Sequence, residues 1–507
     1  MNTSAITETA ATAPLEWSTL SRLPFASFRN TLFEATRGGV RLSALFAQPD
    51  DNGSIDLCAV LSDPRTGSIS VSRTSIGDSY GALTPECPQA HWFEREIAEQ
   101  WGIVPEGHPW LKPVRFHHSY RPGHDAWGRT AASDIPPSVT DFFRIEGAEV
   151  HEVAVGPVHA GVIEPGHFRF QCHGEIVFTL EISLGFQHRG VERALVGGPN
   201  KRTLHYMETL AGDTSIGHAT AYCQVLEALS GTTVPPRGES IRAIALELER
   251  LANHTGDLGA LANDVGYLPT AAYCGRLRGD FLNATGAICG NRFGRSLVKP
   301  GGVRFDVGPE MRDDLILKLT NALRDVDGAV GLLWESPSVQ ARFERVGTVS
   351  RDDCLALGLV GPAARACGVD YDVRRDFPSG AYRATPFPVS TAGTGDVNAR
   401  ALMRWLEIRR SCEFVLEQLA SLPAGPLSVP LQTLRSDAVA VSLVEGWRGE
   451  ICHVGITDAE GRFVRYKVVD PSFHNWVGLM MALRNQEISD FPLCNKSFNL
   501  SYCGHDL

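Results

Sequence analysis

One long stretch with the periodicity of an amphipathic helix constrains the fold of this 507-residue chain more than any other feature. Residues 235–259 read PPRGESIRAIALELERLANHTGDLG, and Ile241, Ile244, Leu248 and Leu251 recur along one side at helical spacing. Two prolines open the segment, as is typical of a helix start. An apolar stripe of this length must be covered by other elements, so the sequence predicts a helical core in this part of the chain.

The same helix carries three polar residues on a shared side. Glu247, Arg250 and His254 stand at positions i, i+3 and i+7, which lie close together on a helix surface. Two interpretations remain open at this point. The three side chains form a supporting hydrogen-bonded network, or they belong to a solvated helix face, where such charge spacings are common.

Short strands and a further helix are predicted near the N-terminus. Residues 27–75 contain β-branched and apolar runs broken by Gly, Asp, Asn and Pro, a pattern that favours strands joined by turns. Farther along, Phe93, Ile97 and Trp101 recur every four residues, and Gly102 follows them. This spacing predicts a helix that ends at the glycine.

These patterns predict an α+β fold class in more than one domain. A second long amphipathic helix is expected over residues 395–422, and strands return from residue 436, with a hairpin turn at residues 459–461. The predicted parts are a flexible N-terminus (1–25), a small α/β domain (26–120), a linker rich in Pro, Gly and Ser (121–150), and a mainly helical domain with peripheral strands (151–507).

Composition excludes several classes of partner and site. The net charge of −11 offers no basic surface for nucleic acid. No stretch approaches the roughly 20 apolar residues that span a bilayer, and the first residues lack a signal-peptide pattern. No two of the twelve cysteines form a C-x-x-C pair, so a zinc ribbon is excluded. The chain is therefore expected in the cytoplasm, attached to a membrane only through partner subunits.

Two sets of motifs resemble subunits of known complexes. EREIAEQWGIVPEGHP (94–109) is similar to the signature of the 30-kDa-type subunit of respiratory complex I. Four later segments resemble the 49-kDa-type subunit of complex I and the related large subunits of membrane-bound group 4 nickel–iron hydrogenases. They are GPVHAGVIEPGHFRF (156–170), GEIVFTLEISLGFQHRGVER (174–193), VPPRGESIRAIALELERLANH (234–254) and RYKVVDPSF (465–473). A fusion of the two is typical of the large subunit of hydrogenase-4 and formate hydrogenlyase complexes.

The resemblance implies a place in a membrane-associated oxidoreductase complex. In such complexes this kind of subunit packs against a small iron–sulfur subunit and lies above antiporter-like membrane subunits, at the cytoplasmic face. The iron–sulfur cluster then belongs to the partner, and no cofactor is assigned to this chain itself. The sequence has no G-x-G-x-x-G in a strand-to-helix setting, so any NADH would bind elsewhere.

The resemblance also indicates that a metal site has lost its ligands. Group 4 hydrogenases hold nickel and iron with two C-x-x-C pairs, because soft thiolates suit these metals. The first pair aligns with TLAGDTSIGHATAYC (209–223), where the cysteine positions are Ala211 and Thr214. The second aligns with the C-terminal segment, where they are Ser501 and Gly504. None of the four supplies a thiolate, so we expect neither a nickel–iron centre nor another metal in this chain.

The likeness to complex I suggests residues that handle protons or quinone. A histidine in a hairpin loop of that family corresponds to His159 or to His167, and an aspartate corresponds to Asp264. Its quinone-binding tyrosine falls on Gly212, which argues against ordinary quinone binding. A histidine near a carboxylate in a partly buried cavity can exchange a proton near neutral pH. We therefore predict that His218, together with these histidines and Asp264, forms the catalytic set.

Three functions remain open on the sequence alone. The first is electron transfer from a partner iron–sulfur subunit, coupled to ion translocation and without a nickel–iron centre. The second is quinone reduction, as in an NADH-quinone oxidoreductase. The third is a non-catalytic scaffold or coupling subunit. His188 and Arg189 add charge that would orient a substrate in the first two cases, or seal the interface with the iron–sulfur subunit.

Overall fold

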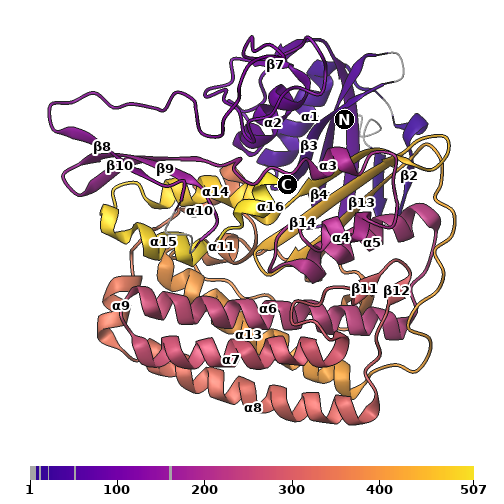
Figure 1. Cartoon of the computed structure of the whole chain (residues 1–507), viewed down its shortest axis with the longest axis vertical. Helices are drawn as coiled ribbons and strands as arrows, with labels where there is room; N and C mark the ends of the chain where they lie inside the picture. Colours follow the sequence, from indigo (N-terminus) through magenta and orange to yellow (C-terminus); the bar gives the residue numbers. More distant parts are fainter. Residues whose placement is uncertain (1–6, 11–12, 21, 51–52, 159–162) are drawn as a thin grey trace.

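The computed structural model describes residues 7–10, 13–20, 22–50, 53–158 and 163–507. Figure 1 shows the N-terminal part at one end, a layer of long helices at the other, and the C-terminal strands between them. The mixture of helices and strands confirms the predicted α+β class. Within the described residues, none of the helices has the length and apolar character that crossing a bilayer requires.

A four-stranded antiparallel sheet forms the N-terminal part, in the order β1-β5-β4-β3. Its helix α1 was not predicted from the sequence, although Phe28, Leu32 and Phe33 bury one side of it. The predicted helix before Gly102 is α2, and this glycine ends it with a φ of 65°. The elements are β1 (Thr7–Ala10), α1 (Phe25–Arg37), β3 (Arg41–Pro49), β4 (Ile55–Asp63), β5 (Ser68–Ile76), β6 (Ser79–Gly81), α2 (His91–Trp101) and β7 (Val104–Glu106).

The N-terminal segment also joins the far end of the chain. Residues Leu15–Glu16 form β2, which pairs with Val439 and Ala438 of β13 (Ala438–Gly446). Leu20, a few residues later, is buried in the core. The prediction of a flexible N-terminus is therefore wrong for residues 15–20, because backbone pairing and burial hold them.

The segment between the two predicted domains has little regular structure. Residues 107–149, which include most of the predicted linker, contain no helix or strand, and the structure describes all of them. A three-stranded antiparallel sheet follows, in the order β10-β9-β8, and extends away from the body of the molecule (Figure 1). Its strands are β8 (Val150–Val155), β9 (His167–His173) and β10 (Ile176–Ser183).

Long helices make up the layer at the opposite end. Both long helices expected from the sequence are present: α6 covers Pro236–Asp264, five residues beyond the predicted end, and α13 covers Val397–Ala420. They pack against each other and against α7 and α8. The remaining helices and short strands of this region are α3 (Val191–Ala194), α4 (Thr203–Met207), α5 (Ser215–Ser230), α7 (Leu268–Cys289), β11 (Val298–Lys299), β12 (Gly302–Val303), α8 (Pro309–Trp334), α9 (Pro337–Phe343), α10 (Arg351–Leu357), α11 (Gly361–Ala366) and α12 (Val373–Asp376).

The C-terminal sheet has the order β15-β14-β13-β2 and packs against α5. The predicted hairpin turn at residues 459–461 connects two of its strands, as expected. Three helices follow the last strand and end the chain. The elements not yet given are β14 (Gly449–Thr457), β15 (Phe463–Val469), α14 (Pro471–Ala482), α15 (Phe491–Phe498) and α16 (Tyr502–Asp506).

A buried ionic contact connects the N-terminal part with this sheet. Glu96 of α2 accepts hydrogen bonds from Lys467 of β15 at 2.6 and 2.7 Å and pairs with Arg115. Lys467 also bonds Glu192 at 2.9 Å. Glu99 accepts backbone N–H groups of residues 114–116. The acidic residues of the EREIAEQWGI motif are therefore structural, because they fix how α2 sits against the rest of the chain.

Candidate functional site

Four buried side chains form a continuous hydrogen-bonded chain between α5 and the C-terminal sheet. His218 Nε2 lies 3.0 Å from Asp470 Oδ2, and His218 Nδ1 lies 3.1 Å from His453 Nε2. His453 Nδ1 lies 2.9 Å from the hydroxyl of Tyr466. All four side chains are buried. We call Asp470, His218, His453 and Tyr466 the histidine chain.

The charge of Asp470 sets the direction of every hydrogen bond in this chain. Burial favours the neutral acid, but the hydrogen bond from His218, its charge and Arg448 hold the pKa of Asp470 below its ordinary value. An ionised carboxylate only accepts, so His218 donates from Nε2, and its neutral form accepts at Nδ1. His453 then donates from Nε2 and accepts the hydroxyl proton of Tyr466 at Nδ1. Every donor therefore points toward Asp470.

The four aligned metal-ligand positions lie in two segments that meet beside this chain. Arg189 donates to the carbonyl oxygen of Leu210 at 3.0 Å and to that of Cys503 at 2.9 Å. Arg448 forms an ion pair with Asp213 at 2.7 Å and also bonds the carbonyl oxygen of Asn499. The loop with Ala211 and Thr214 is thus held against the segment with Ser501 and Gly504.

The packing at Gly504 leaves no space for a side chain. A Cβ atom there would lie 2.7 Å from Asp470 Oδ2 and 2.9 Å from Ser501 Oγ. The Ser501 hydroxyl caps α16 by accepting the Gly504 N–H group at 2.9 Å. Thr214 is buried, and its hydroxyl accepts a hydrogen bond from Arg448 at 3.3 Å. The hydroxyl groups of Ser501 and Thr214 are engaged in hydrogen bonds within the protein. Two such hydroxyls do not fit a centre that needs four thiolates.

Glu249 of α6 adds a second titratable group to this region. Its carboxylate accepts the backbone N–H groups of Ile216 at 2.8 Å and Gly217 at 3.2 Å, at the start of α5. Burial raises the pKa of Glu249 to about 8, and the charge of Asp213 adds to this, whereas the two N–H groups act in the opposite direction. Glu249 therefore changes protonation near neutral pH.

The ladder on α6 is completely buried, so the solvated-face interpretation is wrong. Arg250 Nε donates to Glu247 Oε2 at 3.0 Å, and His254 Nε2 lies 2.9 Å from Glu407 Oε2 of α13. Burial lowers the pKa of His254 to about 4. Arg365 lies at the centre of the surrounding charges. The members of this ionic cluster are Glu247, Arg250, His254, Arg365, Asp372, Arg374, Glu407 and Glu445.

The structure does not pair the histidine and aspartate expected from the likeness to complex I. His167 begins β9 and accepts a hydrogen bond from Arg169 Nε at 3.2 Å, and burial together with Arg169 lowers its pKa. Asp264 ends α6 and is exposed, and partial burial of its carboxyl group raises the pKa to about 6. Within the described residues, no hydrogen bond or ion pair joins the two. His159 lies outside the described residues.

His188 and Arg189, which follow β10, bind the C-terminal helix. His188 Nδ1 lies 2.8 Å from the carbonyl oxygen of Asp506, and Arg189 makes the contacts with residues 209, 210 and 503. Burial lowers the pKa of His188 to about 4. Both residues therefore fix the position of α16.

Sequence reasoning found His218 but missed its partners. Asp470 stands within the quoted motif RYKVVDPSF, where an Asp before a Pro also signals a helix start. Glu164, in the motif GPVHAGVIEPGHFRF, accepts the N–H groups of Tyr502 and Cys503 at 3.3 Å. His453 and Arg448 stand in no motif that the sequence offers. In the described part of the chain, no cluster of three or more His, Cys, Asp and Glu side chains has the arrangement of a metal site.

Comparison with known families covers both parts of the chain. The model for the 49 Kd subunit of the respiratory-chain NADH dehydrogenase matches residues 264–438, and the model for its 30 Kd subunit matches residues 30–126. The resemblance to a fusion of these two subunits is therefore confirmed.

Individual relatives include hydrogenases and complex I subunits. The carbon monoxide-induced hydrogenase of Rhodospirillum rubrum is 32% identical over 353 residues, which are 69% of this chain and 97% of that protein. Formate hydrogenlyase subunit 5 of Escherichia coli is 28% identical over 83% of this chain and 76% of its own length. NADH-quinone oxidoreductase subunit 4 of Thermus thermophilus is 30% identical over 70% and 93%. The chain therefore belongs to the family that joins these complex I subunits with the large subunits of the related membrane-bound hydrogenases, and it is an oxidoreductase subunit.

Proposed function

We propose that this chain is the large subunit of a membrane-associated complex that passes electrons from a partner iron–sulfur subunit and couples this flow to ion translocation, without a nickel–iron centre. The observation that carries the proposal is the state of the four ligand positions. Ala211, Thr214, Ser501 and Gly504 provide no thiolate, and the carboxylate of Asp470 lies where a side chain at position 504 would start. Antiporter-like membrane subunits would carry the ion, with this chain at the cytoplasmic face.

The histidine chain does not take up electrons, but it supplies groups that can accept and pass protons where a partner would deliver electrons. Electron arrival in a buried, low-dielectric region favours uptake of a proton. Asp470 is the acceptor at one end of the chain, and His218 and His453 connect it to the phenol of Tyr466. These residues would receive and hold the proton that accompanies the electron.

The first test is metal analysis of the purified complex. We expect nickel well below one atom per large subunit, with iron accounted for by the partner's clusters. Stoichiometric nickel that depends on this chain, or hydrogen turnover that depends on it, would contradict the proposal.

The second test separates a catalytic role from a scaffold. Asp470→Asn and His218→Gln should each reduce donor-linked electron flux at least tenfold while the complex still assembles, a loss typical of a positioned proton donor or acceptor. His173→Gln is the matched control, because this histidine is exposed, pairs with Glu149, stacks on Phe178 and does not contact the histidine chain. Flux that stays at the control level in both site variants would favour the scaffold.

Quinone reduction is the alternative that one observation favours. Asp264 is exposed at the end of α6, and its pKa of about 6 allows proton donation near neutral pH. Purified complex would be assayed for reduction of a soluble quinone, with Asp264→Asn compared with Asp280→Asn, a change at a half-buried aspartate that pairs with Arg276. Quinone reduction that is lost only in the first variant would replace our proposal with this alternative.

A further inference from the structure

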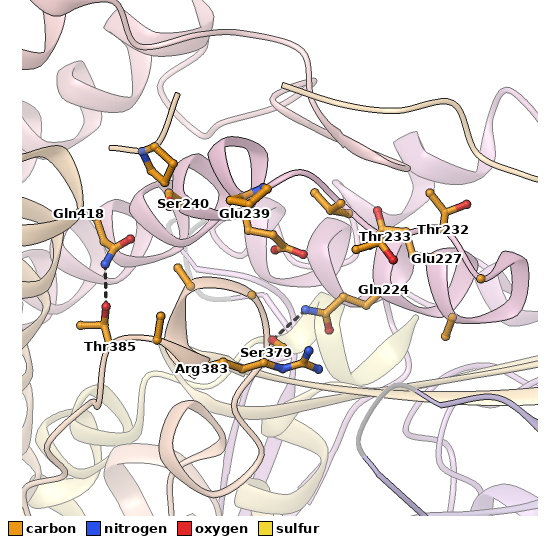
Figure 2. Close-up of a pocket in the computed structure, with 18 of the residues that line it drawn as sticks. Gln224, Glu227, Thr232, Thr233, Glu239, Ser240, Ser379, Arg383, Thr385 and Gln418 are labelled. Carbon is orange, nitrogen blue, oxygen red and sulfur yellow. Dashed lines mark hydrogen bonds between the residues drawn. The ribbon is translucent and has the colours of Figure 1, made fainter. Parts of the chain in front are cut away.

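An open pocket of about 630 Å³ lies between the end of α5, the first turn of α6 and the loop that leads to residue 385. In Figure 2 the carboxylate of Glu239 extends from α6 toward this loop. The walls are held by hydrogen bonds within the protein. Gln224 donates to Ser379 at 3.0 Å, and Gln418 donates to Thr385 at 2.9 Å (Figure 2). The pocket is therefore a preformed entrance that brings solvent to Glu239.

A second, much smaller cavity continues from this pocket into the protein. It has a volume of about 20 Å³ and shares Gln224, Glu239 and Ser379 with the pocket. Thr220 and Glu445, which do not line the open pocket, line this cavity together with Arg374. A cavity of this size holds one water molecule when polar partners line it.

The hydroxyl of Thr220 is an independent sign of that water. Thr220 is buried, and its Oγ1 atom has no hydrogen-bond partner in the protein. A buried hydroxyl without a partner costs about 1–3 kcal/mol, so such groups are normally satisfied by ordered water. Because Thr220 lines the small cavity, a water there would satisfy its hydroxyl, in a cavity whose lining also includes Glu239 and Glu445 and the two arginines Arg242 and Arg374.

Glu445, at the inner end, is the member of the ionic cluster that can change its charge. Its Oε1 atom lies 2.8 Å from Arg365 Nη1, and its Oε2 atom accepts the N–H group of Val373 at 3.1 Å. Burial and then the charge of Asp372 raise the pKa of Glu445 to about 7, against the opposite effect of Arg365, Arg374 and Arg250. The carboxylate of Glu445, on β13, can therefore bind a proton near neutral pH.

Glu239, at the outer end, has a mixed set of charges around it. Burial raises its pKa, Arg242 and Arg383 lower it, and Glu227 raises it. Glu227 is itself neutralised, because it forms a two-fold ion pair with Arg242 at 2.6 and 3.0 Å. Glu239 can therefore take up a proton from the solvent of the open pocket.

We propose that the pocket and the small cavity together form a proton inlet that leads from Glu239, through a water held by Thr220, to Glu445. A proton leaves the Glu239 carboxyl group for the water, the water passes one of its protons to the Glu445 carboxylate, and solvent in the pocket reprotonates Glu239. The use of this inlet during turnover rests on the proposed function, whereas the path itself is a property of the resting protein.

Infrared spectroscopy of the full-length chain tests the path without electron transfer. At about pH 6, below the pKa of about 7, the protonated Glu445 should give a carboxylic acid C=O band that Glu445→Gln removes. After transfer into D₂O the band shifts at the rate at which deuterons reach this carboxyl group. Thr220→Val, which keeps the volume, and Glu239→Gln should each slow this shift about tenfold or more, the effect of about 1.4 kcal/mol on the barrier.

Two internal controls make the result specific. Thr220→Ser keeps the hydroxyl and should exchange at the original rate. The acid band of Glu249, whose pKa is about 8, belongs to another region and should be unaffected, which also reports that the variants are folded. The inlet would be overturned if the Glu445 band shifted at the original rate in both Thr220→Val and Glu239→Gln, or if the shift of the Glu249 band were slowed equally. The absence of a Glu445 acid band would also overturn it. Each outcome is independent of whether the chain transfers electrons.

Discussion

The ionic cluster and the histidine chain are both buried next to β13 and β14, yet they are built from different chemistry. Arginines supply the positive charge of the cluster, and a guanidinium does not lose its proton in a protein. The histidine chain consists of a carboxylate, two imidazoles and a phenol between which protons can move. Permanent charges hold elements together, whereas groups with neutral and charged forms can take part in a reaction. Glu445 is the exception within the cluster, because its pKa is about 7.

The contrast between the two regions would fail most clearly if the ionic cluster could lose its central arginine with little loss in the free energy of unfolding. Arg365→Met leaves Glu407, Glu445 and Asp372 without their shared partner, and we expect a loss of about 3–5 kcal/mol in the free energy of unfolding. Urea denaturation of the full-length chain measures it. Arg324→Met, at an exposed arginine, should change stability by less than about 0.5 kcal/mol. A loss in Arg365→Met no larger than in this control would show that the cluster does not hold the fold.

A smaller effect, with a defined pH dependence, is expected beside the histidine chain. The folded-state pKa of Glu249 is about 8, above its ordinary 4.5, so its protonation stabilises the folded chain at low pH and this contribution is lost as pH rises through 8. Glu249→Gln stays neutral. Relative to the original chain, it should therefore gain about 2 kcal/mol between about pH 6 and pH 8. Denaturation curves at both pH values test this, and a difference that does not depend on pH would contradict it.

The smallest effect sharpens the description of the histidine chain itself. Tyr466→Phe removes the hydroxyl that donates to His453 Nδ1 and leaves this buried nitrogen without a partner. We expect a loss of about 1 kcal/mol in stability. Tyr273→Phe, at an exposed tyrosine, serves as the control and should have no effect. Nitrogen NMR chemical shifts of His453 should show that its proton stays on Nε2, because the direction of the chain is set from Asp470, and a changed tautomer would contradict that direction.

The sequence predicted the elements whose signal is local. The stripes of α6 and α13 are long enough to define a helix without knowledge of the rest, and the positive φ of Gly102 follows from its place after α2. Helix α1 was missed because its Phe and Thr residues also favour strands. The spacing of Phe28, Leu32 and Phe33 would have indicated a helix.

The candidate site was only partly predictable, because its contacts join distant segments. His218 was found through a family motif, but its partners His453 and Asp470 are 235 and 252 residues away. The spacing of Glu247 and Arg250 predicted their contact, whereas their burial depends on α12 and α13 covering that side of α6. A pattern within one helix gives neighbours along that helix but not what lies across from it.

The uniform direction of the histidine chain limits how often it can work. A proton that reached Asp470 along this route would leave Tyr466 as a phenolate and would place the hydrogen of each imidazole on its opposite nitrogen. In that arrangement the chain cannot pass a second proton in the same direction. Both imidazole rings must rotate by half a turn before the chain can transfer another proton. His218 and His453 are packed with no exposed surface, so this reset requires the surrounding core to loosen. The histidine chain would therefore pass one proton for each such loosening of the surrounding core.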